Sequence, residues 1–211
     1  MTRTVDLAPR KAPRQARAKR TVERILEATA ELLDEIGFDR LTTNLVAERA
    51  GVNIGSLYSY FPNKYALLNT LALRLSDRQT ERIRQYLRDV DPATPWRDVS
   101  DGVVDVMVEA SREMPGFVPL QRALLAVPEL HEAYRRTSDP ISREMNVFLR
   151  RWGIDLPEGR LNLIVLCMGE VSAGLLDLAV SEGLAYDEAV IEELRNLLKG
   201  YLMVYLETGG R

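Results

Sequence analysis

Residues 52–64 read VNIGSLYSYFPNK, and this short stretch decides the fold. A buried helix has no need of Gly55, and an ordinary surface helix does not carry two tyrosines so close together. Leu57 and Phe61 are four residues apart, so on a helix they lie on the same side and are expected to face inward. The remaining sides of so short a helix cannot all be buried, which indicates that they contact a surface outside the protein.

The residues on either side of this stretch predict two short helices. Thr42 is a good N-cap for the first of them, and Gly51 ends it. Asn53 can cap the second, over 54–61, and Pro62 then breaks the helical run. The two short helices are therefore joined by a tight turn centred on glycine.

A longer helix is expected just before this pair, over 21–36, with Gly37 ending it. Three helices within about forty residues, the second and third short, form the pattern of a helix-turn-helix. In that arrangement the second short helix lies in the DNA major groove, so its outer residues must be short or flat. Gly55 would let the backbone approach DNA closely, and Ser56 would offer a hydroxyl.

The rest of the chain has helical periodicity and no sustained strand alternation, which predicts an all-α protein. A long helix is expected from Lys64 into the high eighties, capped by Asn63. The stretch DVDPATPW at 89–96 is the expected break between two bodies. Beyond it, helices are expected at 97–113, 117–126, 129–151, 158–182 and 187–206.

Charge is unevenly distributed along the 211 residues. Residues 1–64 contain 11 Lys and Arg against 8 Asp and Glu, whereas residues 65–211 contain 17 against 23. Within residues 1–20 there are seven basic residues and one acidic residue. A basic head on an acidic body indicates a polyanionic partner for the head. Two interpretations of the segment 1–20 stay open, an arm that contacts DNA and a solvated tail.

The single Cys167 and single His131 exclude an intrachain disulfide and a Cys/His metal cluster. No glycine-rich phosphate loop follows a strand, and no nucleophile elbow is present. The sequence therefore predicts a non-enzymatic protein without metal or cofactor. The most apolar stretch, 161–180, is interrupted by Glu170 and Asp177, so we expect a buried helix and a cytoplasmic protein without a membrane span.

The stretch TTNLVAERAGVNIGSLYSYFPNKYALL at 42–68 resembles the DNA-binding domain of the TetR family of bacterial transcriptional regulators. In this family a Gly-Val turn, a small residue, Leu-Tyr, an aromatic residue or His, Phe and Lys recur in this order. Many members have His where this chain has Tyr60. The resemblance implies that the DNA-facing positions are Thr43, Ile54, Gly55, Ser56, Tyr58, Ser59, Tyr60 and Lys64.

The resemblance also implies the organisation of the whole chain. A flexible basic arm at 1–20 would precede a three-helix DNA-binding domain at 21–65. A long helix would join that domain to a ligand-binding and dimerisation domain at 66–211. Such a protein would be a repressor that binds a palindromic operator as a homodimer, with recognition helices about 34–36 Å apart, and that a small effector releases.

The last two expected helices suit the homodimer that the resemblance implies. Helix 158–182 contains small residues in an apolar surround, which permits close helix approach, and helix 187–206 has a broad apolar stripe. The alternative is that both faces fill the core of one monomer. We favour the dimer, because one short recognition helix contacts too little DNA alone.

Met and aromatic side chains in the second domain are the candidates for an effector site, because they adapt to varied apolar ligands. Such residues at helical spacing are more often plain core. The candidates, with one polar partner, are Met107, Phe117, Tyr134, Phe148, Trp152, Met168 and Glu170. The expected effector is therefore small and mostly apolar, and whether Glu170 and His131 face it stays open.

Two other functions remain compatible with the sequence. One is a helical sensor or scaffold whose head binds no DNA, and the other is an architectural DNA-binding protein without a ligand. A salt-sensitive, sequence-specific DNA complex separates the first from a regulator. Release of the DNA by a small molecule separates the second.

Overall fold

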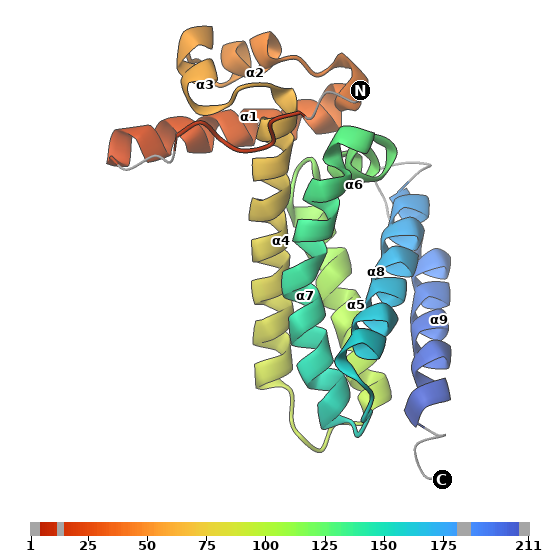
Figure 1. Cartoon of the computed structure of the whole chain (residues 1–211). Helices are drawn as coiled ribbons and strands as arrows, with labels where there is room; N and C mark the ends of the chain where they lie inside the picture. Colours follow the sequence, from red (N-terminus) through yellow and green to blue (C-terminus); the bar gives the residue numbers. More distant parts are fainter. Residues whose placement is uncertain (1–4, 12–14, 181–186, 207–211) are drawn as a thin grey trace. The chain divides into compact units, whose positions relative to one another are not determined.

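The structure, a computed structural model, describes residues 5–11, 15–180 and 187–206 and is built from helices (Figure 1). No β-strand occurs in these described ranges, and the predicted all-α class is confirmed. In chain order the helices are α1 (Ala16–Arg40), α2 (Thr43–Arg49), α3 (Ile54–Tyr60), α4 (Lys64–Asp89), α5 (Trp96–Glu113), α6 (Phe117–Ala126), the short 3-10 helix η1 (Pro128–Leu130), α7 (His131–Arg151), α8 (Glu158–Val180) and α9 (Glu188–Leu206).

The largest departure from the predicted boundaries is at the first helix, which begins at Ala16 instead of residue 21. The prediction began where apolar periodicity begins, but the preceding alanines, lysine and arginines are strong helix formers and extend the helix. At the other end, Gly37 has φ 70° and ψ 175°, so regular α-helical geometry stops there as predicted. Residues 181–182 of the predicted helix 158–182 lie outside the described residues.

The described chain forms two compact units. The first contains described residues of 1–75 and 114–137, and the second contains described residues of 76–113 and 138–211. The helices α4 and α7 each continue from one unit into the other. These units follow packing and do not coincide with the functional boundaries predicted at 20/21 and 65/66, which remain predictions.

The first unit is organised around α1, which α2 and α6 both contact. Its fully buried side chains include Ile25 and Leu33 from α1, Leu57 from α3, and Leu68 from α4. Each such side chain contributes about 1.5–3 kcal/mol by leaving water. Gly116, at the start of α6, has φ +74°, and a Cβ there would lie 2.7 Å from the carbonyl oxygen of Ala30. Only glycine lets α6 approach the backbone of α1 so closely.

The second unit is a helical bundle in which α9 packs against both α8 and α5. Its core contains Leu149, Leu161 and Ile164, which are fully buried. At one place in this core the rings of Phe148 and Trp152 meet edge to face, with centroids 4.0 Å apart. The unit therefore has a continuous apolar core of its own.

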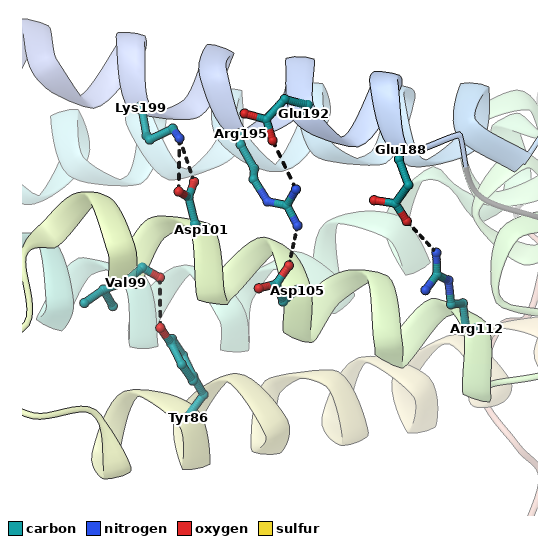
Figure 2. A network of polar contacts seen from close by, with 9 residues as sticks. All are labelled: Tyr86, Val99, Asp101, Asp105, Arg112, Glu188, Glu192, Arg195 and Lys199. Atoms are coloured by element: carbon teal, nitrogen blue, oxygen red, sulfur yellow. Dashed lines mark hydrogen bonds and ion pairs between the residues drawn. The ribbon is translucent and has the colours of Figure 1, made fainter.

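Charged pairs connect α5 to α9 along the surface of the second unit (Figure 2). The ammonium of Lys199 lies 3.0 Å from the Asp101 carboxylate, and the Arg195 guanidinium contacts Asp105. Arg112 and Glu188 form a longer pair at 3.3 Å. Exposed ion pairs each contribute roughly 0–1 kcal/mol. We infer that they fix which residues of α5 and α9 face each other, while the apolar core supplies most of the stability.

The side chain of Tyr86 on α4 occupies the space that a Cβ at residue 102 on α5 would need, so this position is a glycine. The phenol of Tyr86 donates to the carbonyl oxygen of Val99 at 3.4 Å, and Figure 2 shows its ring reaching across to α5. A Cβ on residue 102 would lie 2.0 Å from the Tyr86 hydroxyl oxygen and 2.4 Å from its Cζ. Burial, and then the nearby carboxylates of Asp105, Asp98 and Asp101, raises the pKa of the Tyr86 phenol.

We predict that Gly102→Ala destabilises the protein by roughly 1–3 kcal/mol, because the added methyl overpacks the Tyr86 ring. In the background of Tyr86→Ala the same change should be stabilising by about 1 kcal/mol, since alanine is the better helix former. Urea unfolding of the four proteins measures both effects. A destabilisation of equal size in both backgrounds would contradict the assigned contact.

Candidate nucleic-acid interface and effector region

The two short helices are set by local capping, as the sequence predicts. The Thr42 hydroxyl accepts from the backbone amide of Leu45 at 3.3 Å at the start of α2. The Asn53 side chain accepts from the amide of Gly55 at 2.7 Å at the start of α3. Between them Gly51 has φ 60°, a backbone conformation that glycine adopts without strain. These interactions fix the direction in which α3 leaves the turn.

The sides of α3 divide into a buried one and an exposed one. Leu57 is fully buried, and Phe61, which follows the last residue of the helix, is 1% exposed. On the other side Ser56, Ser59 and Tyr58 are exposed. The structure thus presents small hydroxyl side chains and one tyrosine to the outside on a helix anchored from within.

Two of the residues predicted to face DNA are hydrogen-bonded to each other. The hydroxyl of Thr43, the first residue of α2, lies 2.9 Å from the hydroxyl of Tyr58. Either hydroxyl can be the donor in this bond. The hydroxyl that accepts keeps its own proton, and the one that donates keeps its lone pairs, for an external group. The bond holds the Tyr58 ring at the junction of α2 and α3.

Lys64 opens α4, and its ammonium lies over the ring of Phe38, 4.1 Å from the ring centroid. The ring of Tyr65 lies on the same side, at 5.9 Å from the ammonium. At the same helix start the Asn63 side chain accepts from the amide of Ala66 at 2.8 Å, which is the predicted cap. A cation held by aromatic rings at a capped helix start suits an approaching anion.

Other basic side chains near α2 are occupied by acidic or backbone partners. The guanidinium of Arg49 binds both carboxylate oxygens of Glu35 at 2.7 Å, which ties α2 to α1. That hydrogen bond lowers the pKa of the Glu35 carboxyl. Arg24 donates to the carbonyl oxygen of Gly51 at 3.1 Å. Arg49 and Arg24 therefore stabilise the packing around α2, and we do not assign them to DNA contacts.

A polar hollow of about 270 Å³ lies between the first turns of α1 and the outer side of α3. Gln15, Arg17, Ala18 and Thr21 line it from the α1 side, and Ser56, Ser59 and Tyr60 line it from α3. The sequence prediction left the role of the segment 1–20 open and assigned none of its basic residues, Arg17 included, to a DNA contact. The four-residue spacing of Arg17 and Thr21 places them together once the helix is known to start at Ala16.

The seven predicted effector residues belong to different units of the chain. Met107, Phe148, Trp152 and Met168 belong to the core of the second unit or pack against it. Phe117 is buried in the first unit, and Tyr134 is half-buried in that same unit.

The two polar candidates for the effector site both lie at the surface. Glu170 is exposed. His131 is exposed as well, with its Nε2 3.0 Å from the Leu125 carbonyl oxygen. Four of the candidates thus share the core of the second unit, and the effector site stays a prediction.

The outer faces of α8 and α9 carry a patch of exposed apolar side chains. Over Glu158–Ala179 the mean hydropathy reaches 1.7, so by length and composition this helix could cross a membrane. Only 28% of that window is buried, so the helix is less buried than the sequence predicted. The exposed apolar side chains of the two helices are Leu163, Leu166, Val171, Leu178, Leu197, Met203 and Val204. We call these seven residues the α8–α9 patch. Neighbouring exposed apolar side chains of this kind are candidates for a protein contact.

Comparison with known proteins agrees with this architecture at both ends of the chain. Residues 25–71 match the family described as bacterial regulatory proteins, tetR family, and residues 95–202 match the tetracyclin repressor-like C-terminal domain. A TetR-family regulator structure from Streptomyces coelicolor is 33% identical, with a TM-score of 0.68, and the match covers 88% of this chain and 99% of that one.

Curated relatives match over part of this chain, between 23% and 58% of it in the three examples that follow. The regulator BetI of Stenotrophomonas maltophilia is 29% identical over 115 residues, 54% of this chain and 59% of that protein. The repressor KstR of Rhodococcus jostii is 30% identical over 122 residues, 58% of this chain and 43% of that protein. The class A tetracycline repressor of Escherichia coli is 50% identical over 48 residues, 23% of this chain and 22% of that protein. The chain thus spans about half the length of the first curated relatives it matches.

These matches define a two-part regulator with a DNA-binding helix-turn-helix and a ligand-binding C-terminal domain. The chain belongs to the TetR family of bacterial transcriptional regulators. The family membership predicted from residues 42–68 is confirmed. The individual contacts predicted for the DNA and effector sites stay predictions.

Proposed function

We propose that this regulator is a repressor that binds a palindromic operator as a homodimer and is released by a small, mostly apolar effector. One observation carries the proposal: α3 buries Leu57 on its inner side and exposes Ser56, Tyr58 and Ser59 on its outer side. Relatives named as repressors, KstR and the tetracycline repressors, support the direction of regulation.

In the proposed complex α3 lies in the major groove and the predicted residues take two roles. Ile54, Gly55, Ser56 and Ser59 would meet base edges, where short side chains permit close approach. Phosphate contacts would come from the remaining four, which carry hydroxyls or a charge, namely Thr43, Tyr58, Tyr60 and Lys64. The polar hollow beside α3 would add Arg17 as a further phosphate contact.

The homodimer would form through the α8–α9 patch. The glycines of α8 leave room for a second chain, because a Cβ at Gly169 or Gly174 would meet no atom within 4 Å. The patch continues from α8 onto α9, whose other sides contain Glu192 and Lys199. A helix with such charges suits a protein interface better than a membrane, and we infer a cytoplasmic location. Two-fold symmetry would place two recognition helices about 34–36 Å apart on the operator.

Coupling between effector and DNA would pass along the chain from α5 to α6. The first unit contains α6, which follows α5 and precedes α7 in the chain, and it packs on α1 through Gly116. The backbone of Gly116 also hydrogen-bonds to Asp34 of α1. An effector that rearranges the core around Met107 on α5 would thus displace a helix in contact with the DNA-binding head. A coupling of about 1–3 kcal/mol is sufficient for regulation.

For DNA binding we predict graded effects at two positions. Lys64→Ala should weaken all DNA complexes and lower the salt slope by about 1, because one phosphate contact is lost. Gly55→Ala should retain most of the affinity, whereas Gly55→Leu should lose at least about tenfold, because a large side chain blocks the groove. Mobility shifts at several salt concentrations, with a duplex selected from a randomised library, provide the measurement.

Two outcomes of these mobility shifts would contradict the DNA assignment. Unchanged operator affinity in Gly55→Leu would mean that α3 does not enter the groove. Absence of any salt-sensitive complex with wild-type protein, even at low ionic strength, would favour a sensor or scaffold function.

For the dimer we predict that Leu197→Glu produces monomers, because two carboxylates would meet across the two-fold axis at a cost of several kcal/mol. Val147→Glu is the matched control, since Val147 is 71% exposed and lies on α7, outside the α8–α9 patch. Sedimentation velocity measures both. A monomeric wild-type protein, or one that floats with liposomes, would contradict this interface.

For the effector we predict that some hydrophobic compounds raise the melting temperature and also weaken operator binding, by about 5- to 150-fold. A thermal-shift screen of metabolites and drugs identifies them, and mobility shifts measure the release. Met107→Ala should reduce the thermal shift if the site lies in the core of the second unit. Compounds that bind without changing DNA affinity would point to an architectural DNA-binding protein.

A further inference from the structure

Residues Asp6–Arg10, which we call the strap, form an irregular segment hydrogen-bonded to the end of the recognition helix. The backbone amide of Arg10 donates to the carbonyl oxygen of Tyr60 at 2.8 Å. The Arg10 guanidinium donates to the carbonyl oxygen of Tyr58 at 3.1 Å. The last carbonyls of a helix have no partner within it, and a cation beside them is favourable. Arg10 therefore completes the C-terminal end of α3.

Two asparagines at the start of α4 hold the other part of the strap, which Figure 1 shows in dark red. The Asn63 side-chain amide donates to the carbonyl oxygen of Asp6 at 3.0 Å. The Asn69 side-chain amide donates to the carbonyl oxygen of Leu7 at 2.9 Å. The strap thus connects the end of α3 with the first turns of α4.

The burial of Asn69 indicates that the strap is an integral part of the fold. Its side chain is 3% exposed and stands between the buried Leu68 and Leu71 on α4. Burial of an amide is unfavourable unless the amide is hydrogen-bonded. Its Oδ1 has no hydrogen-bond partner among the described residues, so the bond to Leu7 is the one that accounts for an amide at this position.

We propose that the strap is a positioning element of the DNA interface, which holds the C-terminal end of α3 against α4 and thereby raises operator affinity without contacting bases. The proposal rests on the proposed function, in which α3 enters the major groove. A helix of seven residues has little stability of its own. Fixing its free end before binding removes an ordering cost from the complex.

The first test removes the hydrogen bond from Asn69 to the strap without changing the charge of the protein. Asn69→Leu eliminates the donor to Leu7 at a buried position, so it removes no phosphate contact. We expect operator affinity to fall roughly 3- to 10-fold, with an unchanged salt slope and faster exchange of the Arg10 amide hydrogen. Leu71→Val, at a buried position two residues further along α4, is the control for a general loss of stability and should keep wild-type affinity.

The second test compares two exposed neighbours of equal charge. Arg10→Met and Lys11→Met each remove one cation, but of these two side chains the structure gives a hydrogen bond to α3 only for Arg10. Arg10→Met should lose roughly 3- to 10-fold more operator affinity than Lys11→Met at the same salt concentration. Melting temperatures confirm that both variants are folded.

The outcomes separate the strap from the function on which it rests. Equal affinities of Arg10→Met and Lys11→Met, or of Asn69→Leu and Leu71→Val, overturn the positioning role while operator binding by the wild type stands. A wild-type protein that forms no specific complex with any selected duplex overturns the proposed function itself.

Discussion

The side chains of Leu57 and Phe61 lie four residues apart on one side of α3, and their burial is the constraint on which the DNA-binding surface depends. A helix of seven residues is too short to be stable by itself in water. Its orientation therefore comes from the groups around it: the buried pair within, the Asn53 cap at its start, and the strap at its end. The exposed hydroxyls on the outer side are usable because the inner side is fixed.

The first unit shows how few types of interaction hold such a helix. Glycine at residues 51 and 116 permits backbone geometry or proximity that a side chain would prevent. Asparagine at residues 53 and 63 accepts from backbone amides that the helix starts leave unpaired, and Asn69 donates to a carbonyl of the strap. Apolar burial provides the stability, and these polar contacts decide where each helix begins, ends and points.

In the second unit, too, one set of interactions supplies the stability and another fixes how the helices align. Its apolar core holds α5, α8 and α9 together, and the charged pairs of Figure 2 align α5 with α9 at the surface. Because α9 also carries part of the α8–α9 patch, the charged pairs connect the proposed effector helix to the proposed dimer interface. A movement of α5 would therefore also move α9.

The sequence was enough to predict the helix-turn-helix, the family and most helix ends, because caps and breakers such as Thr42, Asn53 and Pro62 act within a few residues of their own position. The start of α1 at Ala16 was missed. The sequence also identified Leu57 and Phe61 as inward, since their spacing alone places them on one face. Periodicity cannot say which distant backbone a buried amide binds, and so the bond from Asn69 to Leu7, 62 residues away, appeared only in the tertiary structure. For the same reason, only the structure showed that four effector candidates share the core of the second unit, whereas Phe117 and Tyr134 belong to the first unit. Helical spacing predicts that a residue is buried but not which neighbours bury it, because many packings satisfy the same apolar stripe.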